Sequence, residues 1–201
     1  MIVQDNLEKI RKNFSNYISF GEKEWTGFSS FFKIAEVKKR TILHKDGEIS
    51  KYLYYINSGL LRVFFIDRNG TERTFHFAFE DTFVTNYESF IKSKPSNYII
   101  QAIENTQIVK IPYSSLVYAY NNIEYGERLG RLLAEEYIFN FTKKIEAIYT
   151  KTPLERYLSF NKYYPNIHER IPQHYIASYL NITPVHLSRL INQVNSKSNL
   201  R

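Results

Sequence analysis

The stretch "QHYIASYLNITPVHLSRLIN", residues 173–192, contains two short runs of apolar periodicity joined by "NIT". Ala177 lies one turn into the first run, where two steeply crossing helices need a small residue at their contact. Asn181 is a residue that tolerates the left-handed backbone conformation that such a turn requires. Thr183 followed by Pro184 is typical of an N-cap and first helical position. This pattern predicts a helix-turn-helix.

The second run of this motif has an apolar side and a polar side. Its inward positions, with those of the first run, form a small core: Ile176, Ala177, Leu180, Ile182, Leu187 and Leu190. Arginine pairs well with guanine and asparagine with adenine in the major groove, so the polar side is suited to reading DNA. The predicted DNA-contacting residues are Gln173, Thr183, Pro184, Val185, His186, Ser188, Arg189 and Asn192. The alternative is a plain helical hairpin with a solvated outer face.

The charge of the chain is concentrated near this motif. The 201 residues carry a net charge of +7. From position 150 to 201 there are seven basic residues and two acidic ones (Lys151, Arg156, Lys162, Arg170, Arg189, Lys197, Arg201; Glu155, Glu169). Because phosphate contacts need Lys and Arg, this terminal excess indicates a polyanionic partner. A merely basic, soluble surface is the alternative.

The segment from Lys38 to Ile111 has the composition of β-strands. It is dense in Tyr, Phe, Ile and Val, and Asn69-Gly70 separates "LLRVFFI" from "TERTFHFAF". Asn-Gly favours a two-residue type I′ turn, which predicts a β-hairpin. Apolar residues alternate along each arm, so each strand should have one apolar face. Several short strands with turn signals predict an antiparallel barrel or sandwich.

A long helix is predicted from about 123 to 149, with a wide apolar stripe. Since a lone surface helix needs only a narrow stripe, a second copy of the chain is the simplest additional partner. The predicted dimer contacts are Leu129, Leu133, Tyr137, Phe141 and Ile145. Packing within one monomer is an equally open alternative. A capping box at 152–155 starts the next helix, so we divide the chain into residues 1–120, 121–150 and 151–201.

Composition and spacing exclude several classes of protein. There is no cysteine, which excludes disulfides, iron–sulfur clusters and zinc fingers. No apolar run approaches 18 residues, so we expect no membrane span and a cytoplasmic location. The histidines lack metal-ligand spacing (His44, His76, His168, His174, His186). Without a phosphate-binding glycine loop or a nucleophile elbow, we expect neither an enzyme nor a bound cofactor or metal.

The order of these features resembles the Crp/Fnr family of bacterial transcription regulators over essentially the whole chain. The resemblance is carried by "LYYINSGLLRVFF" with its Asn-Gly hairpin, the long helix and "IASYLNITPVHLSRL". It implies an α+β fold with an N-terminal antiparallel β-roll of the cyclic-nucleotide-binding type, a long dimerisation helix and a C-terminal winged helix-turn-helix. It also implies that the second helix of the motif enters the major groove.

Two departures from the family pattern bear on specificity. The Arg-Glu pair that opens the recognition helix in the cyclic-AMP receptor branch is replaced by Pro184-Val185, which predicts a different operator. The sensor region lacks the Gly-Glu-Leu element, and Pro95-Ser96-Asn97 stands where the phosphate-binding Arg is expected. Without that guanidinium we do not expect cyclic AMP to bind. Glu88, Ser96 and Asn97 are candidates to line a pocket for another effector.

The sequence therefore predicts a dimeric DNA-binding transcription regulator with an effector-sensing roll. Its expected partners are double-stranded DNA, a second copy of the chain, an unknown small-molecule effector and, as a further candidate, RNA polymerase. One alternative is a regulator with a degenerate sensor that acts without a ligand. Another is a small-molecule-binding barrel whose C-terminal hairpin mediates protein interaction.

Overall fold

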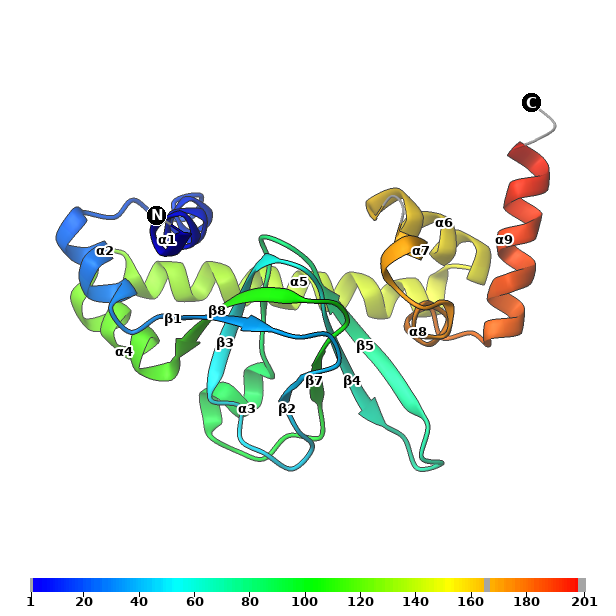
Figure 1. The fold of residues 1–201 in the computed structure, drawn as a ribbon, viewed down its shortest axis with the longest axis horizontal. Helices are drawn as coiled ribbons and strands as arrows, with labels where there is room; N and C mark the ends of the chain where they lie inside the picture. The colour runs from blue at the N-terminus through cyan, green and yellow to red at the C-terminus, as the bar shows by residue number, and fades with distance from the viewer. Residues whose placement is uncertain (1, 165–166, 199–201) are drawn as a thin grey trace. The chain divides into compact units, whose positions relative to one another are not determined.

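The computed structural model describes residues 2–164 and 167–198, with side chains for 7–164 and 167–196 (Figure 1). The chain forms two compact units. Unit 1 holds the described residues of 1–65 and 76–137, and unit 2 holds those of 66–75 and 138–201. The end of one hairpin therefore packs with the C-terminal helices. The division into residues 1–120, 121–150 and 151–201 stays a prediction.

The strands of the described residues form two four-stranded sheets, with the orders β1-β8-β3-β6 and β2-β7-β4-β5. Their bounds are β1 Lys33–Val37, β2 Ile42–His44, β3 Tyr52–Ser58, β4 Leu61–Ile66, β5 Glu72–Ala78, β6 Phe83–Val84, β7 Ile99–Ala102 and β8 Thr106–Pro112. The long pairing of β3 with β8 is antiparallel, as are those of β1 with β8 and β4 with β7. The predicted α+β class with antiparallel sheets is confirmed.

The predicted hairpin is present as β4 and β5, but its turn is longer than expected. Gly70 N–H donates to the carbonyl of Asp67 over 2.9 Å, and Asp67 N–H donates to the carbonyl of Thr71 over the same distance. Gly70 has a φ of +74°, whereas Asn69 is not among the residues with positive φ. A type I′ turn needs positive φ at both central residues, so the predicted turn type was wrong. The Asp67 carboxylate also accepts from Asn69 and Thr71 N–H groups, which favours this wider loop.

Arg62 departs from the predicted alternation along β4. The pattern assigned it to the face opposite Leu61 and Val63, yet its side chain is 0% exposed. Its guanidinium lies over the ring of Phe64, with 4.1 Å between the guanidinium carbon and the ring centroid. The first four residues of β4 are all buried, so both of its faces are covered there. A long cationic side chain can be buried there when its plane packs on an aromatic ring.

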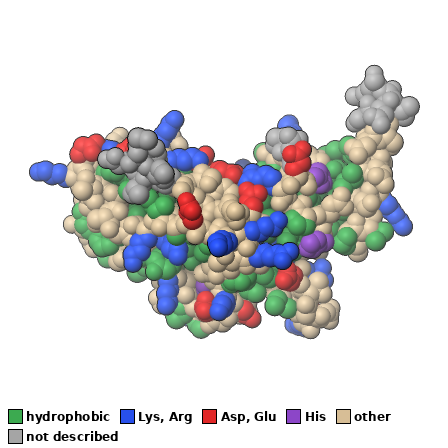
Figure 2. Space-filling model, in the orientation of Figure 1, with side chains coloured by type: hydrophobic (Ala, Val, Ile, Leu, Met, Phe, Trp, Pro, Cys, Tyr) green, Lys and Arg blue, Asp and Glu red, His purple; other side chains and the backbone are tan. Residues whose placement is uncertain are grey.

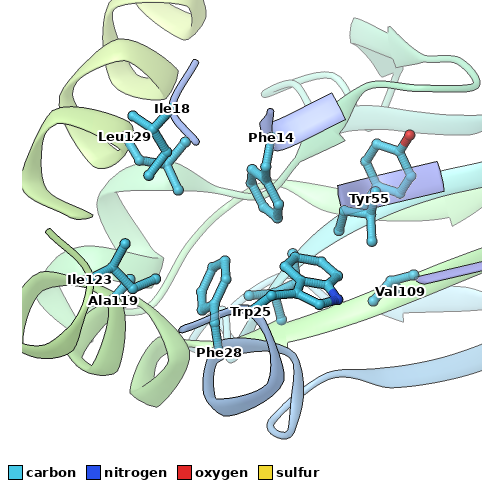
Figure 3. Packing of buried hydrophobic residues seen from close by; sticks show 11 residues of the cluster. Phe14, Ile18, Trp25, Phe28, Tyr55, Val109, Ala119, Ile123 and Leu129 are labelled. Atoms are coloured by element: carbon cyan, nitrogen blue, oxygen red, sulfur yellow. The ribbon is translucent and has the colours of Figure 1, made fainter. Parts of the chain in front are cut away.

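Helices close one side of the roll around an aromatic core. The helices of this part are α1 Ile2–Phe14, α2 Glu22–Ser29, α3 Tyr87–Lys92 and α4 Tyr113–Asn122. Phe14 is stacked on Phe83 at 5.0 Å and lies 5.5 Å from Phe28, measured between ring centroids. Trp25, Phe28 and Leu129 point into the same cluster, which also includes Val109 of β8 (Figure 3). Burial of these large rings is the main stabilisation of unit 1.

The C-terminal part is helical throughout its described residues. It comprises α5 Gly126–Thr150, α6 Pro153–Tyr163, α7 Ile167–Arg170, α8 Gln173–Tyr179 and α9 Pro184–Ser198. The capping box predicted at 152–155 is present, with Thr152 accepting from Glu155 N–H and Glu155 accepting from Thr152 N–H. No strand occurs among the described residues after α5, so the wing stays a prediction. None of the described helices is long and apolar enough to span a membrane.

Candidate nucleic-acid interface

The two helices predicted within residues 173–192 are present as α8 and α9, joined by a short turn. Asn181 has a φ of +54°, the left-handed conformation that the turn was predicted to need. The Thr183 hydroxyl accepts a hydrogen bond from His186 N–H over 3.2 Å, so the predicted N-cap of α9 is present. Ile182 N–H donates back to the carbonyl of Ala177 over 3.0 Å and closes the turn. Local capping chemistry thus fixes where α8 ends and α9 begins.

A small core holds the two helices together. Leu187 is fully buried and Leu190 is 6% exposed, and both face the buried Ile176, Ala177 and Leu180 of the first helix and turn. Ile182, predicted in this core, is half-buried. This inward set leaves the opposite side of α9 free of packing. Every residue of the predicted DNA-contacting set is exposed: Gln173, Thr183, Pro184, Val185, His186, Ser188, Arg189 and Asn192.

The charge of the chain is divided unequally between the two units. Unit 1 contains 16 of the basic residues and 15 of the acidic ones, a net charge of +1. Unit 2 contains the other 11 basic and 5 acidic residues, a net charge of +6. Figure 2 shows Lys, Arg and His side chains exposed on the helical part of the molecule. The unit that carries the exposed face of α9 therefore carries nearly all of the excess positive charge.

The predicted dimer residues of α5 have different environments. Leu129 is 2% exposed and belongs to the core of unit 1, and Leu133 packs against that core. Tyr137 lies 5.5 Å from the ring of Tyr87. Phe141 is stacked on Phe75 in unit 2, and Ile145 is 52% exposed. Four of the five thus pack within their own unit.

A different set of apolar residues on α5 is exposed. Its members are Ile138, Phe139, Ile145 and Tyr149, all more than half exposed. Ile138, Ile145 and Tyr149 are spaced by seven and four residues, the spacing of one helical face. Apolar periodicity alone could not separate this face from the buried one, because the apolar residues extend around most of the helix.

A comparison against protein families matches the part of the chain that forms the sheets. Residues 34–122 match the family model described as "Cyclic nucleotide-binding domain". Residues 34–122 form a cyclic nucleotide-binding domain. The match covers β1 to α4 and ends before the helix-turn-helix. It confirms the kind of sensor domain that the sequence resemblance implied.

Solved structures that share this fold include transcription regulators. FixK2 from Bradyrhizobium japonicum is 16% identical with a TM-score of 0.72, and the match covers 83% of this chain and 86% of that one. CLP from Xanthomonas campestris, described as a c-di-GMP responsive global regulator, is 14% identical with a TM-score of 0.69, over 89% and 93%.

A protein from Eubacterium rectale assigned to the crp/fnr family is 20% identical with a TM-score of 0.69, over 90% and 88%. Identities this low show a shared fold, and they confirm the resemblance to the Crp/Fnr family predicted from the sequence. A search of curated proteins finds no significant match to this chain.

Within the cyclic nucleotide-binding domain, buried hydroxyl groups from the segment between β6 and β7 and from Ser50, just before β3, are hydrogen-bonded within the protein. Ser50 Oγ and Thr85 Oγ1 lie 3.0 Å apart, and Thr85 Oγ1 donates to the carbonyl of Tyr52 over 2.9 Å. Ser89 Oγ accepts from Ser50 N–H over 2.8 Å and donates to the carbonyl of Lys94 over 2.5 Å. Sequence reasoning missed this cluster because the partners are up to 39 residues apart.

The predicted effector residues do not share one environment. Glu88 is exposed and forms an ion pair with Lys92 at 3.1 Å. Ser96 is buried; its hydroxyl accepts from Asn86 Nδ2 and from Tyr98 N–H. Asn97 is exposed. The pocket that these residues were predicted to line stays a prediction.

Proposed function

We propose that this chain is a DNA-binding transcription regulator of the Crp/Fnr type. The observation that carries the proposal is the exposed, capped face of α9, presented by the unit with a net charge of +6. Such a face places His186, Ser188, Arg189 and Asn192 where base edges in a major groove would be read. The surrounding basic residues would supply phosphate contacts. Solved structures that share the fold are described as regulators, so we propose a regulatory and not an enzymatic role.

The first test is the salt dependence of DNA binding. Anisotropy of a labelled mixed-sequence duplex should report binding whose logarithmic affinity falls linearly with the logarithm of salt concentration. If the protein contacts six to ten phosphates, raising the salt concentration from 50 to 200 mM should lower its affinity for DNA by a factor of roughly 10³–10⁵. Binding that is indifferent to salt would reject the proposal.

We further propose that the chain acts as a dimer through α5. The exposed residues Ile138, Ile145 and Tyr149 form an apolar stripe with coiled-coil spacing, and a second copy would cover it. Two-fold symmetry would place two α9 helices about one turn of DNA apart, on a pseudo-palindromic site. Predicted partners are therefore double-stranded DNA and a second copy, with RNA polymerase and an effector as further proposals.

Analytical ultracentrifugation tests the dimer. Ile138→Asp combined with Ile145→Asp should shift the protein to a monomer, because two charges would lie on the covered face. Tyr163→Asp is the matched control, since Tyr163 is a 78% exposed aromatic residue of α6 outside the stripe. The proposal fails if the double variant sediments as the unmodified chain does.

A sensor that does not use cyclic AMP is favoured by the hydroxyl cluster. Ser50, Thr85 and Ser89 are buried and hydrogen-bonded within the domain, so these hydroxyls already have partners without a bound phosphate. No arginine occurs between positions 85 and 98 to bind one. The c-di-GMP responsive CLP shares this fold, which supports an effector other than cyclic AMP. A regulator that needs no ligand is the second candidate, favoured by the same closed cluster.

A further inference from the structure

Lys144 of α5 lies in an aromatic enclosure within unit 2. Its Nζ is 4.1 Å from the ring centroid of Tyr179 on α8 and 5.0 Å from that of Phe75 in the middle of β5. The amine also donates a hydrogen bond to the carbonyl oxygen of Phe75. Phe141, three residues before Lys144, stacks on Phe75 with 4.7 Å between centroids and 8° between planes. One amine thus contacts both the hairpin end and the first helix of the helix-turn-helix.

A second set of contacts joins the same two segments. Thr74 N–H donates to Ser178 Oγ over 2.8 Å, and Ser178 Oγ donates to the carbonyl of Glu72 over 3.2 Å. Ser178 and Tyr179 are adjacent on α8, so the hydroxyl contact and the amine contact lie side by side. The hairpin end at 72–75 is therefore attached to α8 by two hydrogen bonds between its backbone and the Ser178 hydroxyl, and Lys144 contacts the same two segments.

The surroundings of Lys144 favour its neutral form. Burial lowers the pKa of the Lys144 amine to about 7. The two ring faces attract a cation and oppose this shift, but among the described residues no carboxylate contributes to it. The enclosure therefore resembles an apolar pocket closed by one carbonyl more than an ion-pair site.

The other charged or titratable groups on the packed elements do not replace a carboxylate. On the hairpin, Arg73 is paired with Asp67 at 2.7 Å, and Glu72 contributes a carbonyl. On α8, burial raises the pKa of the Tyr179 phenol, so it stays neutral, and His174 is exposed. The flanking charges on α5 are the exposed residues Lys143 and Glu146.

We propose that Lys144 is a proton-sensitive latch that holds the hairpin end on helix α8 and loosens when its amine is protonated. Burial in the docked arrangement favours the neutral amine, whereas a lysine released into water is an ammonium. The docked arrangement therefore binds fewer protons and weakens as the pH falls. For a docked pKa of about 7 and a free pKa of about 10.4, docking weakens roughly fivefold between pH 8 and pH 7. Below about pH 6 the effect levels off.

NMR of the full chain tests the latch directly. The carbon next to Nζ of Lys144 should titrate near neutral pH. The exchange protection of the Thr74 amide should fall severalfold from pH 8 to pH 7, after correction for intrinsic exchange. In Lys144→Met this protection should lose its pH dependence, and in the matched control Lys143→Met it should keep it.

Each outcome of these measurements either supports or overturns the latch. Titration of Lys144 above pH 9.5, or Thr74 protection that follows pH equally in Lys144→Met, would overturn the latch. If Lys144→Met does not fold, the titration of Lys144 in the unmodified chain decides alone. These readouts involve no DNA, so a failure of the DNA-binding proposal would leave them unchanged. If both proposals hold, DNA affinity should follow pH in the unmodified chain but not in Lys144→Met.

Discussion

Arg156 Nε of helix α6 donates a hydrogen bond to the carbonyl oxygen of Leu180, 3.2 Å away, where α8 ends. A second guanidinium nitrogen of Arg156 donates to the carbonyl of Lys151 over 2.6 Å, just after α5. One cation therefore satisfies carbonyls at two helix ends, where the helix dipole favours positive charge. This basic residue, counted above with those expected to attract DNA, is engaged within the protein.

Arg156→Ala should destabilise the helical unit without reducing the number of phosphate contacts that the protein makes to DNA. Loss of charge-assisted hydrogen bonds to two carbonyls should lower the free energy of unfolding by about 1.5–3 kcal/mol, measured in urea. The slope of DNA affinity against salt should stay unchanged. A slope reduced by about one, with stability intact, would instead assign Arg156 to the DNA surface.

Substitutions of Asn181 should follow backbone conformation. With φ at +54°, Asn181→Ala should cost about 1 kcal/mol of stability, because a β-carbon is disfavoured there. Asn181→Gly should be neutral or stabilising, since glycine has no such penalty. Thermal unfolding of both variants checks this, and equal effects of the two changes would contradict it.

Substitution of Gly126 and of Gly130 by alanine should differ in the loss of stability, although both residues lie in α5. A β-carbon on Gly126 would fall 1.9 Å from the carbonyl oxygen of Ala119, so the backbone of α4 would have to move. On Gly130 it would meet the Tyr120 hydroxyl at 2.5 Å, at the end of a side chain. Gly126→Ala should therefore destabilise the chain by about 1–3 kcal/mol or more, and Gly130→Ala by less. Reversal of this order in chemical unfolding would contradict the α4–α5 packing.

The helix pair α8–α9 and its turn could be predicted in detail because their signals are local. The Thr183 cap, the left-handed Asn181 and the buried Leu187 all depend on residues within a few positions. The hairpin was also predicted, but Asp67 selected a wider turn by accepting two backbone N–H groups. The signal for that outcome, Asp67 two residues before Asn69, was present in the sequence.

The partners of long-range contacts could not be predicted. Phe141 looked like a dimer residue because periodicity shows that a position is apolar, not what it packs against, and it stacks on Phe75. The burial of Arg62 depends on where β4 lies in its sheet. The enclosure of Lys144 joins positions 75, 144 and 179, and no spacing rule connects them.

Cyclic AMP should not stabilise the chain. The segment from Thr85 to Tyr98 contains no arginine, and the buried hydroxyls of Thr85 and Ser89 are already hydrogen-bonded within the protein. A thermal-shift titration with cyclic AMP should therefore match that with 5′-AMP. A midpoint that rises with cyclic AMP alone, as binding to the folded state requires, would show that another group holds the phosphate.

Arg189 tests the central claim most directly, because it is an exposed cation on the predicted reading face of α9. The measurement is the affinity of Arg189→Ala for a duplex selected from a randomised pool by the unmodified chain. Arg128→Ala, an exposed arginine of unit 1, is the matched control, and circular dichroism verifies folding. The account predicts binding weakened by about 1–3 kcal/mol, roughly tenfold or more, for Arg189→Ala alone. Unchanged affinity of folded Arg189→Ala, or an equal loss in Arg128→Ala, would contradict DNA reading by α9.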